Sequence, residues 1–258
     1  MRALSPKTKE RKVRDYISPS DLSFLWEKCH KCFWLKYNKG ISQPGFMPLV
    51  GPTATFQERV YQGLPTDQLD TKLPKGIVTS WGAGVESTPI VINGKATKWR
   101  IKGKYDLVIT FSDDTLGIID CKVTTSEMGE DKVDLYWPQL EAYAYALENP
   151  LEGEGTKVSE SGLLMWRVIG AAGDQSAGYT FTTDKEYLSA GRRAEEFQNR
   201  VSQVIEMLEG SEPESGSDCG YCKYVIKLQT YNDEVLEIVC DIHVKEPMEK
   251  DPKIRRTK

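Results

Sequence analysis

Two acidic residues and a lysine stand on neighbouring segments of the chain, where together they could support a metal-assisted reaction. Side chains alternate between the two faces of an extended strand, so Asp120 and Lys122 point the same way while Cys121 points into the opposite face. Asp106 lies on the preceding segment, and the turn-forming residues 112–115 can fold the two segments into a hairpin. Two carboxylates beside an ammonium group suit hydrolysis of a phosphodiester with a divalent metal ion.

The ligand types predict which metal ion would bind. Carboxylate oxygens are hard ligands that favour Mg²⁺ or Mn²⁺, which keep several of their own waters. Lys122 would then orient or deprotonate the attacking water, or offset developing negative charge. The competing interpretation is a solvated ion pair at the edge of a sheet. Against it, apolar residues occupy both faces of residues 116–123, which is typical of a buried central strand where an unpaired charge is costly.

The hairpin must meet one condition on register if the two acids are to approach each other. A two-residue turn that pairs Phe111 with Leu116 sets Asp106 opposite Cys121, and Asp106 then points away from Asp120. One additional loop residue, or a bulge, exchanges the faces and brings the carboxylates together. We therefore predict an odd-length loop or a bulge between these strands.

In these residues the sequence resembles the PD-(D/E)XK nuclease superfamily, in particular its RecB-like branch and the CRISPR-associated exonucleases related to it. In that family an acid on one strand and an acid-x-lysine motif on the next bind metal and catalyse cleavage. The resemblance therefore implies these roles for Asp106, Asp120 and Lys122. The following helix in the RecB-like branch carries Gln-x-x-x-Tyr, which implies that Gln139 and Tyr143 share one helix face near the scissile strand.

The resemblance is close over residues 98–147 and implies an α/β restriction-endonuclease-like core, with a mixed central β-sheet flanked by helices. Relatives often have a histidine or an acid on an earlier helix as another metal ligand. The two histidines of this chain, His30 and His243, lie elsewhere. Glu58 is the substitute candidate, and the other interpretation of this residue is an exposed helical glutamate. A missing ligand would mean weak or absent catalysis.

Two Cys-x-x-Cys pairs, one near each end of the chain, form a second candidate site. They are Cys29 with Cys32 and Cys219 with Cys222. Four such thiolates can close a tetrahedral Zn²⁺ site or hold an iron-sulfur cluster, and two unrelated reduced pairs are the alternative. Resemblance to RecB-like nucleases that clamp a 4Fe-4S cluster favours iron. The symmetric two-plus-two spacing favours zinc.

Net charge argues against a nucleic acid as ligand, but the charge distribution favours one. The formal charge is −4 and the pI is about 5.5, whereas most proteins that bind phosphates present a basic surface. Four cationic residues occupy every second position of one segment, and Asp106 continues the same alternation. If that strand is regular, they form a track for a DNA backbone, and a solvated polar face is the alternative. The four are Lys98, Arg100, Lys102 and Lys104.

Composition sets the outer bounds. The chain has 258 residues, of which 39% are hydrophobic and 28% charged, so it can bury a sizeable core. No stretch is apolar for long enough to span a bilayer, and the first residues lack the apolar run of a secretory signal. We expect a cytoplasmic protein from a bacterial, archaeal or phage context, with reduced thiols. Cys121 and Cys240 are expected to be small buried hydrophobes.

The expected domain organisation has three parts. They are a basic flexible tail over residues 1–15, a nuclease-like domain with both cysteine pairs over 16–225, and a partly disordered C-terminal extension over 226–258. Helices are predicted over residues 18–36, 55–62, 138–147 and 184–209, with Pro44 to Pro52 and residues 211–218 as loops. Strands are predicted near residues 77–81, 88–92, 98–111, 116–123, 162–169 and 178–182.

These features predict a Mg²⁺- or Mn²⁺-dependent deoxyribonuclease. The expected substrate is the end of single-stranded DNA, as an exonuclease in recombination, phage replication or CRISPR-type processing would cleave it, with a possible protein partner and no membrane association. The alternative is a catalytically inactive protein of the same fold that binds DNA or a partner protein.

Overall fold

A five-stranded mixed sheet is the largest sheet of the structure, a computed structural model that describes residues 14–43, 50–127, 129–176 and 178–245. The chain divides into two compact units, Met1–Glu214 and Ser215–Lys258, and each is described by itself. The sheet belongs to the first unit, and its strand order is β10-β9-β8-β7-β2. The bounds are β2 Gly76–Trp81, β7 Leu107–Phe111, β8 Leu116–Thr124, β9 Val158–Asp174 and β10 Gly178–Ser189.

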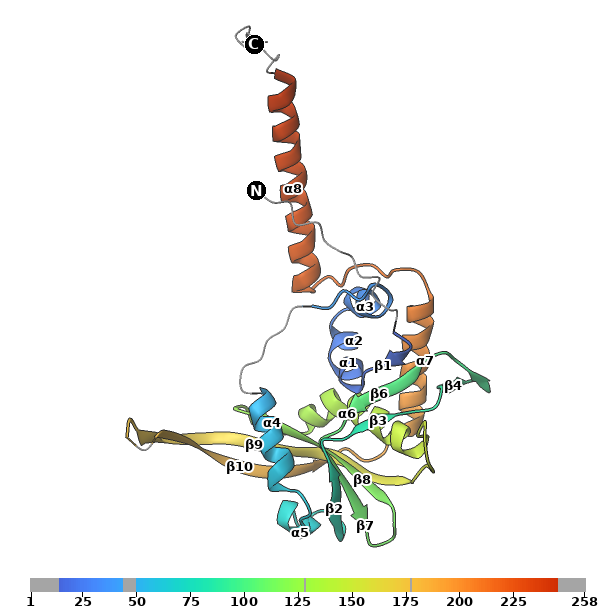
Figure 1. The fold of residues 1–258 in the computed structure, drawn as a ribbon, viewed down its shortest axis with the longest axis vertical. Coiled ribbons are helices and arrows are strands. Elements are labelled where there is room, and N and C mark those ends of the chain that lie inside the picture. The colour runs from blue at the N-terminus through green and yellow to red at the C-terminus, as the bar shows by residue number, and fades with distance from the viewer. Residues whose placement is uncertain (1–13, 44–49, 128, 177, 246–258) are drawn as a thin grey trace, which may run out of the picture. The chain divides into compact units, whose positions relative to one another are not determined.

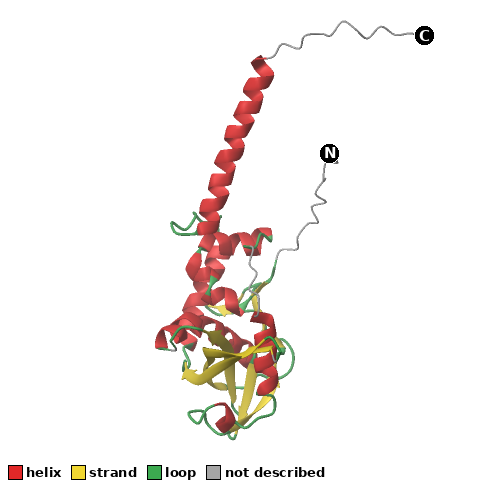
Figure 2. Ribbon diagram, turned by 90° about the vertical axis from the view of Figure 1, so that its left-hand side faces the viewer, coloured by secondary structure: helices red, strands yellow, loops and turns green. Residues whose placement is uncertain are grey.

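The sheet is mixed because β8 and β9 are parallel while the other neighbours are antiparallel. Helix α6 (Glu130–Glu148) makes the crossover between β8 and β9. It packs on one face through a core that includes Ile118 and Leu163. The opposite face buries Ile119, Cys121 and Leu164, so Cys121 is buried as predicted. Strands with helices beside them are visible in Figures 1 and 2, and the expected mixed α/β core, a central sheet flanked by helices, is confirmed.

The hairpin between β7 and β8 has the predicted odd-length loop. Leu107 pairs with Ile119, and the last backbone hydrogen bond of the ladder joins the Phe111 N–H to the Thr115 carbonyl at 2.9 Å. Three residues, 112–114, therefore form the loop, and the last of them, Asp114, has the left-handed backbone (φ 62°) of a hairpin with a bulge. Continuing this register places Asp106 opposite Asp120.

The prediction of one strand over residues 98–111 is wrong, because this segment forms two strands that belong to different sheets. Residues Arg100–Lys104 form β6, which lies between β1 (Tyr16–Ile17) and β3 (Gly84–Glu86) in a separate three-stranded sheet. Only Leu107–Phe111 belongs to the main sheet as β7. The strand predicted at 88–92 is reduced to β4 (Val91–Ile92), which pairs with β5 (Lys95–Ala96) across a turn.

Helix α6 begins eight residues before the predicted start, at Glu130, and has Pro138 in its interior. Proline was expected at the first turn, because inside a helix it removes one hydrogen bond and crowds the preceding turn. The neighbouring backbone N–H compensates: Gln139 donates to the Ser23 hydroxyl at 3.0 Å. Ser23 lies at the end of α1 and is fully buried, so α1 is fixed against the irregular turn of α6.

The single helix predicted over residues 18–36 is divided into short pieces: α1 (Pro19–Ser23), α2 (Leu25–Lys28), α3 (His30–Trp34) and the π-helix η1 (Leu35–Lys39). Ser18 is the N-cap and Pro19 the first helical residue, as predicted. The extended backbone of Cys29 (φ −171°) ends α2. Downstream lie α4 (Val50–Val60) and α5 (Thr66–Leu69), so the end of the loop predicted at 44–52 is helical, and residues 44–49 lie outside the described chain.

The helix predicted to begin at Asp184 begins ten residues later. Residues 184–189 continue β10, and Tyr187 is buried in the sheet core. Helix α7 covers Ala194–Glu209 and buries the predicted apolar face, which consists of Phe197, Val201, Val204, Ile205 and Leu208. Beyond the end of β8, strands β9 and β10 continue as a two-stranded projection (Figure 1).

The second unit contains one long helix, α8 (Gly220–Lys245), after the predicted connector. The side chain of Cys240 and the disorder predicted from Pro247 onward lie outside what the structure describes. Among the described helices, none combines the length and apolar character needed to cross a membrane.

Candidate active site

The hairpin register brings the two predicted carboxylates onto one face of the sheet, the face that α6 covers. Asp120 is 3% exposed and Asp106 is half-buried. The backbone N–H of Cys121 donates to Asp106 Oδ2 at 2.7 Å, which fixes the Asp106 carboxylate beside β8. Asp120 Oδ2 is buried and receives no well-formed hydrogen bond, although the Lys122 ammonium group contacts it. A buried carboxylate beside a second carboxylate is suited to a cation.

The proximity of these acids is reflected in a perturbed pKa. Burial, followed by the negative charge of Asp120, raises the pKa of Asp106 to about 7. Lys122 and the Cys121 N–H act in the opposite direction but do not compensate. Like charges in a poorly solvated pocket disfavour simultaneous ionisation. Asp106 and Asp120 therefore need more positive charge nearby before both carboxyl groups can ionise.

Lys122 supplies part of that positive charge. Its ammonium group pairs with Asp120 and lies 4.8 Å from the centre of the Tyr136 ring. Burial alone would lower the pKa of Lys122, but the charges of Asp120 and Asp106 raise it overall. In the absence of a metal ion this lysine is therefore protonated, which favours orientation and charge compensation over proton abstraction.

Of the two predicted residues of the helix motif, Gln139 contacts this group directly and Tyr143 lies within its electrostatic reach. Gln139 Nε2 donates to Asp120 Oδ1 at 2.8 Å, and Gln139 is 5% exposed. The Tyr143 hydroxyl donates to the Lys104 carbonyl at 2.6 Å, and burial raises the pKa of Tyr143. Gln139 thus orients a candidate ligand, whereas Tyr143 fixes the end of β6. Gly103 lies beside Tyr143, and a Cβ there would come within 3.0 Å of the ring.

Glu58 is buried at this site rather than exposed on a helix surface. It lies on α4, is 9% exposed, and pairs with Lys104 Nζ at 3.0 Å. Its charge contributes to the raised pKa of Asp106, so it shares the electrostatic environment of the carboxylate pair. Gly82 (φ 54°) makes room for it, because a Cβ at Gly82 would collide with the Glu58 carboxylate.

Two further residues of the site, Gln57 and Tyr136, were not predicted from the sequence. The Gln57 amide donates to the Lys122 carbonyl at 3.4 Å, and the Tyr136 ring lies against the Lys122 ammonium group. Gln57 is adjacent to Glu58, and Tyr136 precedes Gln139 by less than one helical turn. The signal by which the sequence could have identified these two residues is their helical spacing from Glu58 and Gln139.

The predicted DNA-binding cations do not form a free basic track. Arg100 pairs with Asp15 and Glu86, both at 2.7 Å, and Lys102 pairs with Glu86 at 2.5 Å. Lys98 precedes β6 and lies 5.0 Å from the centre of the Trp99 ring. Lys104 is paired with Glu58 in the site. Arg100, Lys102 and Lys104 share one face of β6, but the continuous strand that would have joined them to Asp106 is interrupted.

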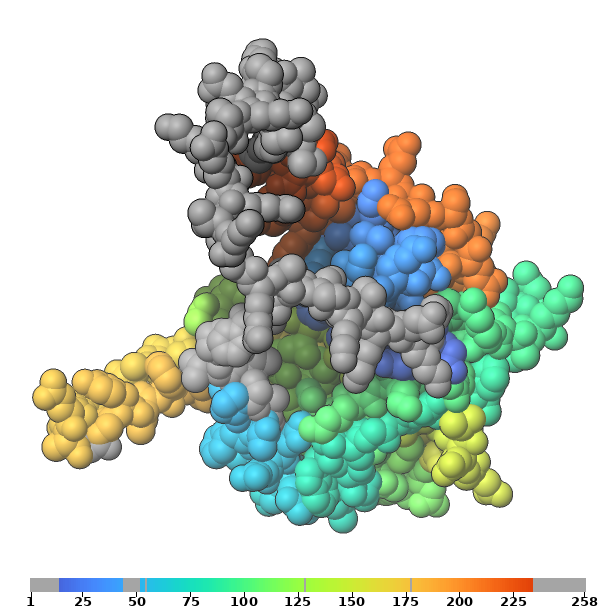
Figure 3. All heavy atoms as spheres, turned by 45° about the horizontal axis from the view of Figure 1, so that its top comes forward, coloured from blue at the N-terminus to red at the C-terminus, as the bar shows by residue number. Residues whose placement is uncertain are grey.

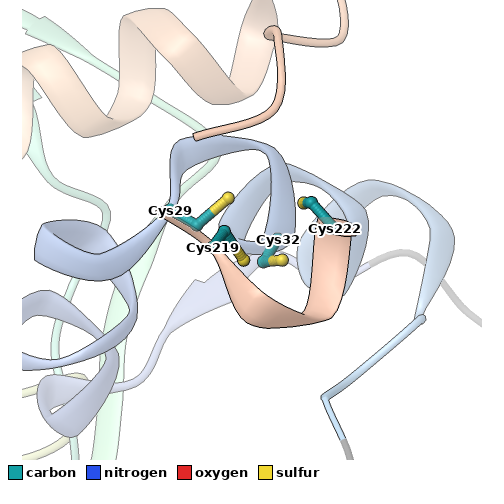
Figure 4. Close-up of side chains that lie close together, drawn as sticks. All are labelled: Cys29, Cys32, Cys219 and Cys222. Atoms are coloured by element: carbon teal, nitrogen blue, oxygen red, sulfur yellow. The ribbon is translucent and has the colours of Figure 1, made fainter. Parts of the chain in front are cut away.

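The cysteine pairs form a group with the spacing of metal ligands. The sulfur atoms of Cys29, Cys32, Cys219 and Cys222 all lie within 4.8 Å of one another, and all four residues are buried (Figure 4). Thiolates in such a group suit a structural zinc ion or an iron-sulfur cluster. His30 stacks on Trp26, with ring centres 4.0 Å apart, and is not a member of the group.

Comparison with known proteins identifies the family of the chain. One solved structure, "Crystal structure of SSO0001", is 14% identical and aligns over 84% of this chain and 86% of its own, with a TM-score of 0.46. A comparison with curated proteins gave no match. Residues 53–226, well over half of the chain, match the family described as the PD-(D/E)XK nuclease superfamily, whose members act on nucleic acid. The chain is therefore a member of the PD-(D/E)XK nuclease superfamily.

Proposed function

We propose that the protein is a Mg²⁺- or Mn²⁺-dependent deoxyribonuclease in which Asp106 and Asp120 bind the metal ion and Glu58 completes the acidic site. The observation that carries this proposal is the pair of carboxylates on one sheet face, with Asp120 buried, one lysine between the two acids, and a pKa of about 7 on Asp106. Oxygen donors of this kind fit a hard divalent cation. When bound, such an ion would polarise the phosphoryl group and activate the attacking water.

The remaining side chains have roles that follow from their contacts. Lys122, protonated and paired with Asp120, is placed to orient the water and offset charge on the phosphoryl oxygens. Gln139 keeps Asp120 in one orientation through its 2.8 Å hydrogen bond. Tyr143 holds the end of β6, which carries the candidate DNA-binding residues Arg100, Lys102 and Lys104 beside the site. Lys98, the fourth, would contact the backbone farther from it.

The proposed substrate is the end of a single DNA strand. This choice comes from the resemblance to RecB-like exonucleases, together with the scarcity of unpaired cations on β6, since duplex DNA needs many phosphate contacts. The second candidate function is that of a non-catalytic DNA-binding accessory. The ion pairing of Glu58 with Lys104 favours it, because a ligand held in an ion pair is less available to a metal ion.

We also propose a bound metal at the four cysteines, either Zn²⁺ or a 4Fe-4S cluster. The grouping of four sulfur atoms within 4.8 Å supports both. Protein purified without oxygen distinguishes them, because a cluster gives a brown colour and zinc gives none.

The test of the nuclease function compares wild-type protein with two variants on an end-labelled single-stranded oligonucleotide, with Mn²⁺ and with EDTA. Asp120→Ala removes a candidate ligand. Asp131→Ala is the matched control, because Asp131 is an exposed acid on the neighbouring helix. We expect cleavage by wild type and Asp131→Ala in Mn²⁺ only, and none by Asp120→Ala. DNA binding without cleavage by all three proteins would establish the accessory function instead.

A further inference from the structure

Lys122 is the more exposed member of its ion pair in the candidate active site. Its side chain is 23% exposed, whereas that of its partner Asp120 is 3% exposed. Among the described residues, Asp120 is the sole hydrogen-bond acceptor that the ammonium group reaches. A lysine carries several N–H donors at the end of a flexible stem. One ion pair therefore does not determine where the other donors point, and a second contact is needed to hold the group.

The ring of Tyr136 supplies this second contact. Lys122 Nζ lies 4.8 Å from the ring centre, within the range of a cation–π interaction. Tyr136 lies on α6 one helical turn before Gln139, so the two side chains share a helix face. This face of α6 contacts both members of the ion pair, because Gln139 binds the carboxylate and Tyr136 binds the ammonium group.

Phe24 braces the ring of Tyr136 from the side. The two rings meet edge-to-face, with their centres 5.1 Å apart and their planes at 80°. Phe24 is 42% exposed, so this contact is not a by-product of burial in the core. It directly follows Ser23, which accepts the backbone N–H of Gln139. Two neighbouring residues near the start of the fold thus hold the two residues of α6 that contact the ion pair.

The ring of Tyr136, rather than its hydroxyl group, makes these contacts. Within the described part of the chain the hydroxyl group has no hydrogen-bond partner. The competing interpretation is that Tyr136 only fills space beside the lysine, which any apolar side chain of similar size could do. Attraction to a cation needs the negative face of an aromatic ring. Tyr136→Phe therefore keeps the ring contact with Lys122, whereas Tyr136→Leu keeps only the apolar bulk.

We propose that Tyr136 is a positioning residue for the proposed reaction. Its ring, braced by Phe24, holds the Lys122 ammonium group beside Asp120, so that the remaining N–H donors face the attacking water or the phosphoryl oxygens. This inference rests on the proposed nuclease function for the role of Lys122. Misplacement of a reacting group by about 1 Å can cost on the order of 100-fold in rate, so a contact that fixes the ammonium group affects catalysis.

The first measurement detects the ring contact in metal-free protein and does not depend on cleavage. Protons above an aromatic ring are shielded, so the ε-methylene protons of Lys122 should resonate upfield of those of exposed lysines. Protein labelled with ¹³C-lysine gives these signals, and Lys122→Arg assigns them. We expect the upfield shift in wild type and in Tyr136→Phe, and its loss in Tyr136→Leu.

The second measurement is the single-turnover rate in Mn²⁺ on the end-labelled oligonucleotide, with DNA affinity measured separately in EDTA. Tyr136→Leu should cleave on the order of 10-fold more slowly at unchanged DNA affinity. Tyr136→Phe should cleave like wild type, and Phe24→Leu should fall between the two. Tyr179→Leu is the matched control. Tyr179 is 71% exposed on the projection of β9 and β10, whose yellow and orange atoms stand clear of their neighbours in Figure 3, and its loss should change nothing.

The proposal is overturned if Tyr136→Leu cleaves as fast as wild type, if Tyr136→Phe is as slow as Tyr136→Leu, or if wild type lacks the upfield shift. A loss of DNA affinity equal to the loss of rate would also overturn it, since Tyr136 would then bind the strand instead of positioning Lys122. Circular dichroism checks that Tyr136→Leu folds. If it does not, Phe24→Leu decides, because loss of the brace should reduce the upfield shift and the rate together, and a reduced shift with an unchanged rate would overturn the proposal.

The outcome is separable from that of the nuclease test. If the upfield shift is present but wild type does not cleave in Mn²⁺, the nuclease function fails and the ring contact stands as a structural one. If Asp120→Ala abolishes cleavage while Tyr136→Leu cleaves at the wild-type rate, the positioning role fails and the nuclease function remains.

Discussion

At the scale of single residues, the site is a place where negative charge is concentrated beyond what its cations neutralise. Asp106 and Asp120 share one lysine, and Glu58 is paired with another. The sequence predicted the three acids and Lys122, because their types and spacing carry the chemistry. It did not predict the pairing of Lys104 with Glu58, which joins residues far apart in the chain and depends on the packing of α4.

The raised pKa of Asp106 predicts how the stability of the metal-free protein depends on pH. Its pKa is about 7 when folded and about 3.9 when unfolded. Between these values the folded protein keeps a proton that the unfolded chain has lost, so stability falls as the pH rises to about 7. Asp106→Asn should lack this decline and, in EDTA at pH 8, should be more stable than wild type by on the order of 1–3 kcal/mol. Urea unfolding at pH 5 and pH 8 measures the difference, and equal pH dependence of the two proteins would contradict it.

Gly82→Ala tests the space that holds Glu58. Alanine at Gly82 is strained by the positive φ and also collides with the Glu58 carboxylate. Gly94→Ala is the matched control, since Gly94 has φ 74° but nothing within 4 Å of an added Cβ. Gly94→Ala should lose about 1 kcal/mol of stability in thermal unfolding, and Gly82→Ala should lose more because of the added collision. Only Gly82→Ala should also lose Mn²⁺-dependent cleavage, and equal cleavage by the two variants would show that the position of Glu58 is unimportant.

At the scale of elements, the register of one hairpin determines whether the site exists. Pairing of Phe111 with Thr115 around the loop 112–114 places Asp106 and Asp120 on one face, and this feature could be predicted because the alternation of a strand is a strict rule. Element boundaries were less predictable. Residues 184–189 have a composition that allows a helix, but pairing with β9 and burial of Tyr187 make them a strand. Likewise, tertiary contacts from Ser23 stabilise Pro138 inside α6.

Deletion of Thr110 tests the register directly. With Phe111 still paired with Thr115, the shortened strand sets Asp106 opposite Ile119 and moves Asp106 to the opposite face of the sheet. We expect loss of cleavage on the order of 100-fold or more, with helical circular dichroism retained. The control is Asp114→Gly, which keeps the loop length and suits the positive φ of that position. Its activity should equal that of wild type, and full activity of the deletion variant would exclude the proposed pairing of the two acids.

At the scale of the whole molecule, the cysteine group draws on residues from near both ends of the chain. The sequence predicted its members, because paired thiols at short spacing are a strong signal. It could not identify the metal, since zinc and iron-sulfur clusters use the same ligands and the choice depends on cluster assembly rather than on spacing.

Substitution of one cysteine should lower both metal content and thermal stability. In Cys219→Ser the remaining thiolates bind metal more weakly, and metal binding contributes directly to folding free energy. His30→Ala is the control, because His30 lies inside the first cysteine pair but outside the group. Elemental analysis should find about one zinc ion or one 4Fe-4S cluster per chain in wild type and in the control. It should find much less of the same metal in Cys219→Ser. Equal metal content in all three proteins would mean that these cysteines do not bind it.

The hydrogen bond between Ser23 and Gln139 has a consequence for the smallest functional fragment. The family match begins at residue 53, yet Ser23 accepts the backbone N–H of the residue that orients Asp120. Leu22 and Phe33 are also fully buried in the core that Trp137 of α6 completes. A truncation that begins at residue 53 would therefore expose apolar surface and release Gln139 from its anchor. Residues 14–43 thus serve as an internal scaffold for α6, the helix that carries Gln139.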